Sequence, residues 1–217
     1  MKGKPTMTAG NGFNKEKVAD ANRVSTQDTL KPGLRHRAIV IGASAGGMRA
    51  LGKFVSMLPS GFSKIIVIAQ HLYPQRDSTT YQYLGGKCCL TVKEAQEKET
   101  AVPGIVYTAP PNYHLLVEQD GTFSLSVDEK VNYSRPAIDV LFTSAARVWM
   151  SRLVGIILTG ANHDGTLGLE AIKQFGGLTI AQDPGTAEFP AMPQAAIDAG
   201  VVDRIMTLVA MGEWLNR

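Results

Sequence analysis

The sequence predicts an α/β protein of three layers, with a mainly parallel, doubly wound sheet and an antiparallel hairpin near one edge. Apolar runs within the segments 38–41, 64–70 and 153–158 are typical of strands that are buried on both faces. Segments with apolar residues at helical spacing alternate with these runs. Short strands separated by turn residues, between 104 and 127, indicate the hairpin.

The elements justify this fold class in order along the chain. The strand at 38–41 leads through Ser44 into a helix, and the strand at 64–70 ends directly in His71. Pro136 suits the first turn of a strongly amphipathic helix. The other predicted strands are 88–92, 104–108, 113–118, 122–127 and 178–181, and the later helices are 138–149, 166–175, 192–199 and 208–215.

Composition and charge divide the chain into two parts. We expect residues 1–37 to form a basic, disordered N-terminal arm and residues 38–217 to form one folded domain. The arm carries a net charge of +5 and the remainder −2, so the folded part lacks the basic surface that nucleic-acid binding needs.

Compartment and cofactors follow from what the sequence lacks. No stretch approaches the roughly 18–20 apolar residues of a membrane span, so we expect no membrane insertion. Cys88 and Cys89 are adjacent, which suits neither a stabilising disulfide nor a structural zinc site, and a reducing cytoplasm is therefore expected. We expect neither a metal nor an organic cofactor.

Ser44 lies in a Gly42-x-Ser44-x-Gly46 turn between a strand and a helix, which is the pattern of a hydrolase nucleophile elbow. A helix-capping or turn serine is the alternative reading. A dinucleotide-binding loop fits less well, because Ser44 replaces the second glycine of that pattern and no acidic residue ends the next strand. A phosphate-binding P-loop is excluded, because no Gly-Lys-Ser/Thr follows.

Three polar side chains, Ser44, His71 and Asp164, each follow the carboxyl end of a predicted strand. Ligands of open parallel sheets bind at that edge, so the fold can bring the three together as nucleophile, general base and orienting carboxylate. Backbone N–H groups of Ala45 and Gly46, with one from the 160–162 loop that contains Ala161, are the expected oxyanion donors. Each residue also has a structural reading, as a loop contact, turn or helix cap.

The order of these residues along the chain is serine, histidine, aspartate. The α/β-hydrolase fold has the order serine, aspartate, histidine, so an ordinary esterase or lipase is a poor match despite the elbow.

From Ala38 to the C-terminus the sequence resembles the catalytic domain of CheB-type protein-glutamate methylesterases of bacterial chemotaxis. The resemblance implies a Ser44–His71–Asp164 triad and hydrolysis of glutamate methyl esters on the cytoplasmic helices of a methylated chemoreceptor. It also implies methanol release and a possible second activity, glutamine deamidation. The motifs that carry it are Ile41 to Gly47, Gln70-His71, Ala109-Pro110 with His114, Arg135-Pro136-x-x-Asp139-Val-Leu-Phe142, Leu158-Thr-Gly160, Asp164-Gly165, Ala181-Gln182 and Met192-Pro193.

The sequence departs from the family pattern at two places near the site. Ala45 stands where members often have threonine, which removes a hydroxyl worth about 1–3 kcal/mol of oxyanion stabilisation. His163 precedes Asp164, and we expect it to be peripheral.

Further predictions concern how the protein is regulated and which residues bind its substrate. Typical members carry an N-terminal receiver domain, which 37 arm-like residues cannot encode, so the resemblance implies a stand-alone catalytic domain that is either constitutively open or controlled by a partner, a separate regulatory protein. Arg135 and Asp139 are candidates for guiding the substrate or for an ion pair that positions the helix, and Met192 for lining the cleft. The alternative function is a catalytically weak module that binds receptors or signalling partners.

Overall fold

The computed structural model describes residues 36–71 and 80–216. The predicted N-terminal arm therefore lies outside the described residues, apart from His36 and Arg37. The strands are β1 (Ala38–Ala43), β2 (Ile65–Gln70), β3 (Thr91–Glu94), β4 (Ile105–Thr108), β5 (His114–Val117), β6 (Phe123–Ser126), β7 (Leu153–Ile157), β8 (Leu178–Gln182) and β9 (Arg204–Met206). The helices are α2 (Gly47–Val55), α3 (Thr80–Gly85), α4 (Ile138–Trp149), α5 (Thr166–Gln174), α6 (Ala191–Asp198) and α7 (Leu208–Leu215), with short 3₁₀ turns η1 (Met150–Arg152) and η2 (Pro184–Thr186).

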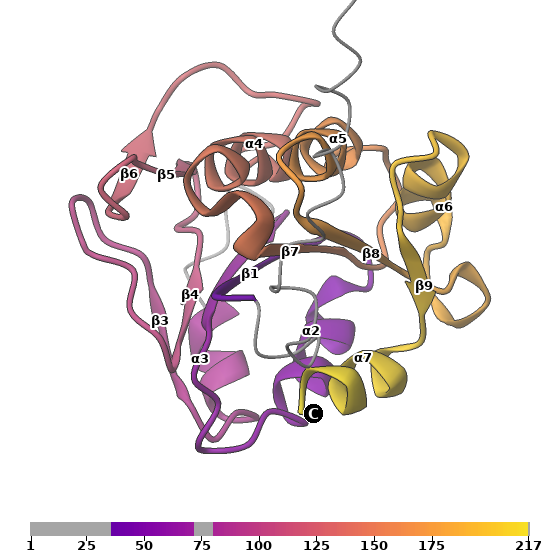
Figure 1. The fold of residues 1–217 in the computed structure, drawn as a ribbon, viewed down its shortest axis with the longest axis horizontal. Helices are drawn as coiled ribbons and strands as arrows, with labels where there is room; N and C mark the ends of the chain where they lie inside the picture. Colours follow the sequence, from indigo (N-terminus) through magenta and orange to yellow (C-terminus); the bar gives the residue numbers. More distant parts are fainter. Residues whose placement is uncertain (1–35, 72–79, 217) are drawn as a thin grey trace, which may run out of the picture. The chain divides into compact units, whose positions relative to one another are not determined.

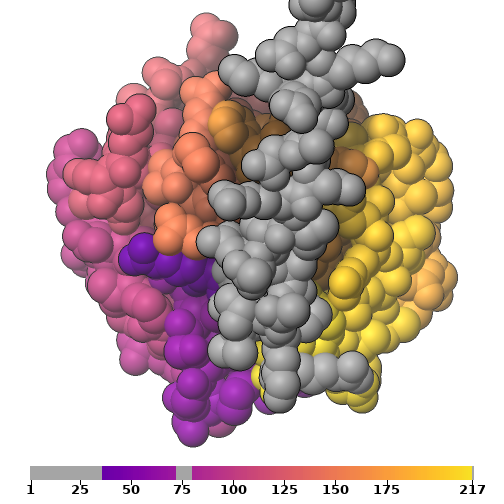
Figure 2. Space-filling view, in the orientation of Figure 1, coloured from indigo at the N-terminus to yellow at the C-terminus, as the bar shows by residue number. Residues whose placement is uncertain are grey.

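Seven strands form one parallel sheet in the order β3-β4-β2-β1-β7-β8-β9 (Figure 1). Strands β5 and β6 pair antiparallel in a sheet of their own, and β5 packs on α4. In the space-filling view of Figure 2, the β3–β4 region lies at the left and the C-terminal segment, in yellow, lies at the right. The predicted fold class is confirmed.

The central strand β1 is apolar throughout because both of its faces are covered. Val40 packs into a core with α4 and α5, while Ile39 and Ile41 pack into a second core with α2 and α7. Figure 1 shows these helix pairs on opposite sides of the sheet. All six residues of β1 are buried, which explains the continuous apolar run. In a half-exposed strand, apolar and polar residues would alternate.

The structure differs from the sequence prediction at three strands. The segment 104–108, grouped above with the hairpin strands, pairs in parallel with β2 and β3. Strand β3 begins at Thr91, three residues later than the predicted start at 88. Strand β9 was not predicted, because its three residues include an exposed arginine and give no apolar run.

The sheet positions the candidate site at its topological switch point. The chain leaves β1 for β2 on one side and later places β7 on the other side of β1. Backbone hydrogen bonds extend this pairing beyond the strand ends, from Ser44 N–H to the Thr159 carbonyl (3.0 Å) and from His71 N–H to the Ala43 carbonyl (3.0 Å). The residues that follow β1, β2 and β7 therefore meet at one edge, where open α/β sheets bind ligands.

Among the described helices, none combines the length and apolar character needed to cross a membrane.

Candidate active site

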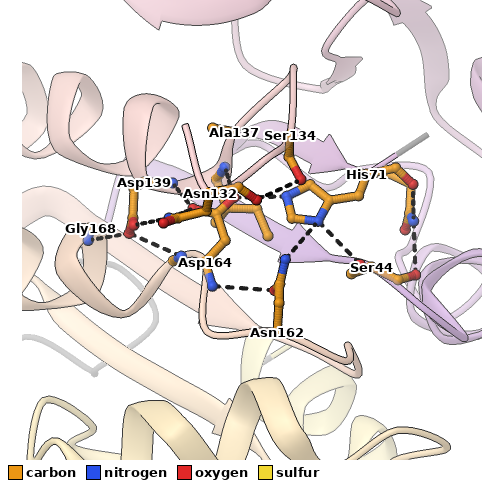
Figure 3. A network of polar contacts seen from close by, with 12 residues as sticks. Ser44, His71, Asn132, Ser134, Ala137, Asp139, Asn162, Asp164 and Gly168 are labelled. Atoms are coloured by element: carbon orange, nitrogen blue, oxygen red, sulfur yellow. Dashed lines mark hydrogen bonds and ion pairs between the residues drawn. The ribbon is translucent and has the colours of Figure 1, made fainter. Parts of the chain in front are cut away.

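Ser44, His71 and Asp164 form one hydrogen-bonded chain (Figure 3). The Nδ1 atom of His71 lies 3.1 Å from Ser44 Oγ, and its Nε2 atom lies 2.7 Å from Asp164 Oδ2. Because the carboxylate accepts the Nε2–H proton, Nδ1 presents a lone pair to the serine hydroxyl. The structure thus brings together the three predicted residues from three strand ends, and their catalytic roles stay predictions.

The turn at Ser44 depends on glycines and on one buried amide side chain. Gly46 has a φ of 74° and is the N-cap of α2. At Gly47 an added Cβ would clash with Gln70 Oε1 and lie 2.8 Å from the Ala43 Cβ. The Gln70 amide donates to the backbone carbonyls of Ser44 and His71, at 2.9 Å each, and so holds the two loops together.

Asp164 is fully buried, and four donors surround its carboxylate. Oδ2 accepts from His71 Nε2 and from the Ile138 N–H (2.7 Å each), while Oδ1 accepts from the Asp139 N–H (3.1 Å) and from Asn132 Nδ2 (3.0 Å). Burial raises the pKa of this carboxyl, but the bonds from His71, Ile138 and Asn132 outweigh it and lower the pKa to about 2. Asp164 is therefore ionised at neutral pH.

Asp139 is a second buried carboxylate, only 6% exposed. Its Oδ1 accepts from the backbone N–H groups of Gly165 (2.9 Å) and Gly168 (2.7 Å), at the N-terminus of α5. Burial, followed by the negative charge of Asp164, raises the pKa of Asp139 to about 6, although the Gly168 N–H opposes the shift.

The predicted oxyanion donors lie around the mouth of the site. Within the described residues, the backbone N–H groups of Ala45, Gly46 and Ala161 make no hydrogen bond. The Thr159 hydroxyl donates to the Ala45 carbonyl (3.0 Å), and this bond fixes the peptide between Ala45 and Gly46. Ala161 lines an apolar hollow of about 300 Å³ with Phe189, Pro190, Ala191 and Gln194. The oxyanion role of these amides stays a prediction.

The other predicted binding residues lie in different surroundings. Arg135 donates through Nη1 to the carbonyls of Val127 (2.6 Å) and Asp128 (2.9 Å). Met192 is fully buried, and its N–H donates to the Gly160 carbonyl (3.0 Å). His163 is exposed. The roles of Arg135, Met192 and Asp139 in substrate binding stay predictions, as does the peripheral role of His163.

Sequence reasoning missed two asparagines of the network. Asn132 donates to both buried carboxylates, and Asn162 lies with its amide nitrogen 3.5 Å from His71 Nδ1 while its Oδ1 accepts the Asp164 N–H (3.2 Å). Asn132 has a φ of 49°, a conformation that asparagine tolerates better than most residues. The one available signal was an asparagine in a short polar segment just before the predicted helix at Pro136.

A serine, a histidine and an aspartate, hydrogen-bonded at the carboxyl edge of a parallel sheet, are the arrangement that a serine hydrolase of the α/β class requires. A family model described as CheB methylesterase matches residues 39–215, and the chain belongs to this family.

Relatives and a solved structure agree with this membership. A relative from Leptospira interrogans is 49% identical over 184 residues, which are 85% of this chain and 95% of that protein. The "Protein-glutamate methylesterase/protein-glutamine glutaminase" of Thermotoga maritima is 37% identical over 196 residues, 89% of this chain but only 57% of that relative. The crystal structure of the Thermotoga maritima CheB methylesterase catalytic domain matches with a TM-score of 0.80 at 37% identity and covers 83% of this chain and 97% of that one.

Proposed function

We propose that this protein hydrolyses glutamate methyl esters on the cytoplasmic helices of chemoreceptors and releases methanol. The observation that carries the proposal is the chain of contacts from Ser44 Oγ through His71 to Asp164, at 3.1 and 2.7 Å. The name of the Thermotoga maritima relative supports the substrate class. The reaction takes place in the cytoplasm, because the proposed substrate is the cytoplasmic part of a receptor.

In the first half of the reaction the serine becomes acylated. The Ser44 hydroxyl proton passes to His71 Nδ1 while Oγ attacks the carbonyl carbon of the ester. The carbonyl oxygen becomes an oxyanion, which accepts hydrogen bonds from the predicted donors Ala45, Gly46 and Ala161. When the tetrahedral intermediate collapses, the methoxide takes the proton from Nδ1 and leaves as methanol.

In the second half a water molecule repeats these steps. His71 Nδ1 takes a proton from the water, whose oxygen attacks the acyl carbon, and the proton then returns to Ser44 Oγ. The products are the free glutamate carboxyl group and the regenerated serine. Asp164 stabilises the imidazolium form of His71 in both halves.

Glutamine deamidation follows the same course with a different leaving group. His71 Nδ1 would protonate the amide nitrogen, which leaves as ammonia, and the product is again glutamate. The second half of the relative's printed name supports this activity.

The test is methanol release from a methylated receptor fragment. We expect Ser44→Ala to lower the rate at least about 10³-fold with the protein still folded. Ser56→Ala is the matched control, because Ser56 is exposed at the end of α2 and its hydroxyl donates to the nearby Lys53 carbonyl. The rate of this variant should equal that of the wild type. Equal rates for Ser44→Ala and the wild type would remove the proposed nucleophile. Absence of methanol release by the wild type would favour a binding module.

A further inference from the structure

We propose that Asn132 is a positioning residue of the triad, and that its side-chain amide holds the Asp139 and Asp164 carboxylates in place by donating to both. This inference rests on the proposed function for its kinetic test. It concerns residues that lie beyond Asp164 as seen from Ser44. They belong to a hydrogen-bond network that continues from Asp164 to Asp139 and Gly168 (Figure 3).

Two helix N-termini bring the carboxylates together. The first N–H groups of α4, from Ile138 and Asp139, donate to Asp164, which lies just before α5. The N–H groups of Gly165 and Gly168, at the start of α5, donate in return to Asp139 in the first turn of α4. Each carboxylate therefore lies at the positive end of the other residue's helix, where negative charge is stabilised.

Close packing of the two helices enforces this arrangement. An added Cβ at Gly168 would clash with the Phe142 Cβ and lie 3.3 Å from the Asp139 Cα. The two carboxylates consequently cannot separate without opening the helix pair. Two buried like charges in contact with one another repel, and each raises the proton affinity of the other.

Asn132 lies where it can reduce this repulsion. Its Nδ2 atom is 3.0 Å from Asp139 Oδ2 and 3.0 Å from Asp164 Oδ1. Among the described residues, no lysine or arginine side chain pairs with either carboxylate. The bridging donor is therefore a neutral amide, which offers one N–H to each oxygen.

Two other side chains fix the loop that carries Asn132. Buried His114 contacts the Glu129 carbonyl through Nε2 (3.0 Å) and accepts the Ala137 N–H through Nδ1 (3.2 Å). Arg135 holds the carbonyls of the two residues that precede Glu129. Both ends of the loop are thus anchored, and Asn132 is held in its left-handed conformation with a φ of 49°.

Within residues 36–71 and 80–216, three histidines lie in contact with the pair or next to it. His71 contacts Asp164, His114 contacts the start of α4, and exposed His163 precedes Asp164 in the chain. Burial and then the charge of Asp164 raise the pKa of Asp139, whereas the hydrogen bonds from His71, Ile138 and Asn132 lower the pKa of Asp164 despite its burial.

The decisive variant is Asn132→Gly, because glycine keeps the left-handed backbone free of strain and removes only the amide. We expect kcat for the methyl ester to fall about 10-fold or more, with KM within about twofold of the wild type. The proton affinity of the carboxyl pair rises, so the acid-side inflection of the kcat–pH profile moves to higher pH. Adding Asp139→Asn removes one of the two charges and should return the inflection toward the wild-type position.

A control and a second variant accompany it. Asn112→Gly is the matched control, because Asn112 has a φ of 63° on an exposed turn, and its kinetics should match those of the wild type. Asn132→Asp keeps the side-chain shape but replaces the donor by a third carboxyl group, so it should lower kcat further. Thermal unfolding verifies that each variant is folded.

Titration of the Asp139 and Asp164 carboxyl carbons by ¹³C NMR supplies a readout that needs no substrate. The titration midpoints should move upward in Asn132→Gly, and unchanged midpoints in a folded variant would overturn the proposal. An unaltered kcat–pH profile would do the same. Absence of methanol release by the wild type would instead count against the proposed function, while the carboxyl titration still decides the role of Asn132.

Discussion

The two ends of the Ser44–His71–Asp164 chain are built in contrasting ways. Asp164 is fully buried and accepts from four donors, two of them backbone N–H groups of α4. Ser44 is half-buried on a glycine turn, and among the described residues its hydroxyl has a hydrogen-bond partner only in His71, at 3.1 Å. The difference teaches that the carboxylate is fully arranged before a substrate arrives, whereas the nucleophile is left open for contacts that the substrate completes.

We expect the largest effect on turnover from a substitution of Asp164, at the buried end of the chain of hydrogen bonds. Asp164→Asn should lower kcat about 10⁴-fold, because an amide cannot hold His71 in the tautomer with a proton on Nε2. The free energy of unfolding should fall by only about 1–3 kcal/mol, since the side-chain shape is retained. Asp120→Asn, on an exposed turn, is the control. Nearly unchanged turnover in a folded Asp164→Asn protein would make Asp164 a structural turn residue.

At the Ser44 end, the test is a substitution in the glycine turn rather than the removal of a charge. Gly47→Ala places a Cβ against Gln70 Oε1 and Ala43, so we expect a loss of about 1–3 kcal/mol of stability by denaturant unfolding. Turnover should fall as well, because Gln70 also holds the Ser44 and His71 carbonyls. Gly61→Ala is matched to it, because an added Cβ at Gly61 meets no atom within 4 Å. Equal stabilities of the two variants would contradict the tight packing of this turn.

Stability as a function of pH sharpens the comparison further. The pKa of Asp139 is about 6 in the folded protein against an ordinary 3.8, so the folded state binds more protons than the unfolded state between these values. The contribution of Asp139 is therefore present below pH 3.8 and is lost as pH rises through about 6. Asp139→Asn, which keeps an oxygen acceptor for Gly165 and Gly168, should flatten this part of the curve. Urea unfolding at pH 4, 5, 6 and 7 measures the change; identical slopes for both proteins would refute it.

The smallest effect is expected at the rim of the open end. Arg49 and Glu188 form an ion pair there, and the Arg49 side chain is 77% exposed. Solvent and salt screen such pairs, so Arg49→Ala should change stability by less than about 0.5 kcal/mol. A loss of several kcal/mol in a thermal or chemical melt would mean that this rim is as preorganised as the Asp164 end.

The sequence allowed prediction of the parallel core and of the strand ends that carry Ser44, His71 and Asp164. Those predictions succeeded because fully buried strands leave continuous apolar runs, and because the carboxyl edge of such a sheet is a general binding place. The surroundings of Asp164 could not be predicted in the same way. Two of its donors are the backbone N–H groups of Ile138 and Asp139, which any residue type supplies. Asn132 lies 32 positions before Asp164, in a loop without periodicity.

The exchanged caps of α4 and α5 have a consequence for local opening of the molecule. Fraying of the first turn of either helix breaks hydrogen bonds at the start of the other, so the two turns should open as one cooperative unit. The amide hydrogens of Ile138 and Gly168 would then exchange with solvent at matching rates, although they belong to different helices. Solvent would reach the Asp164 carboxylate only while both of these turns are open.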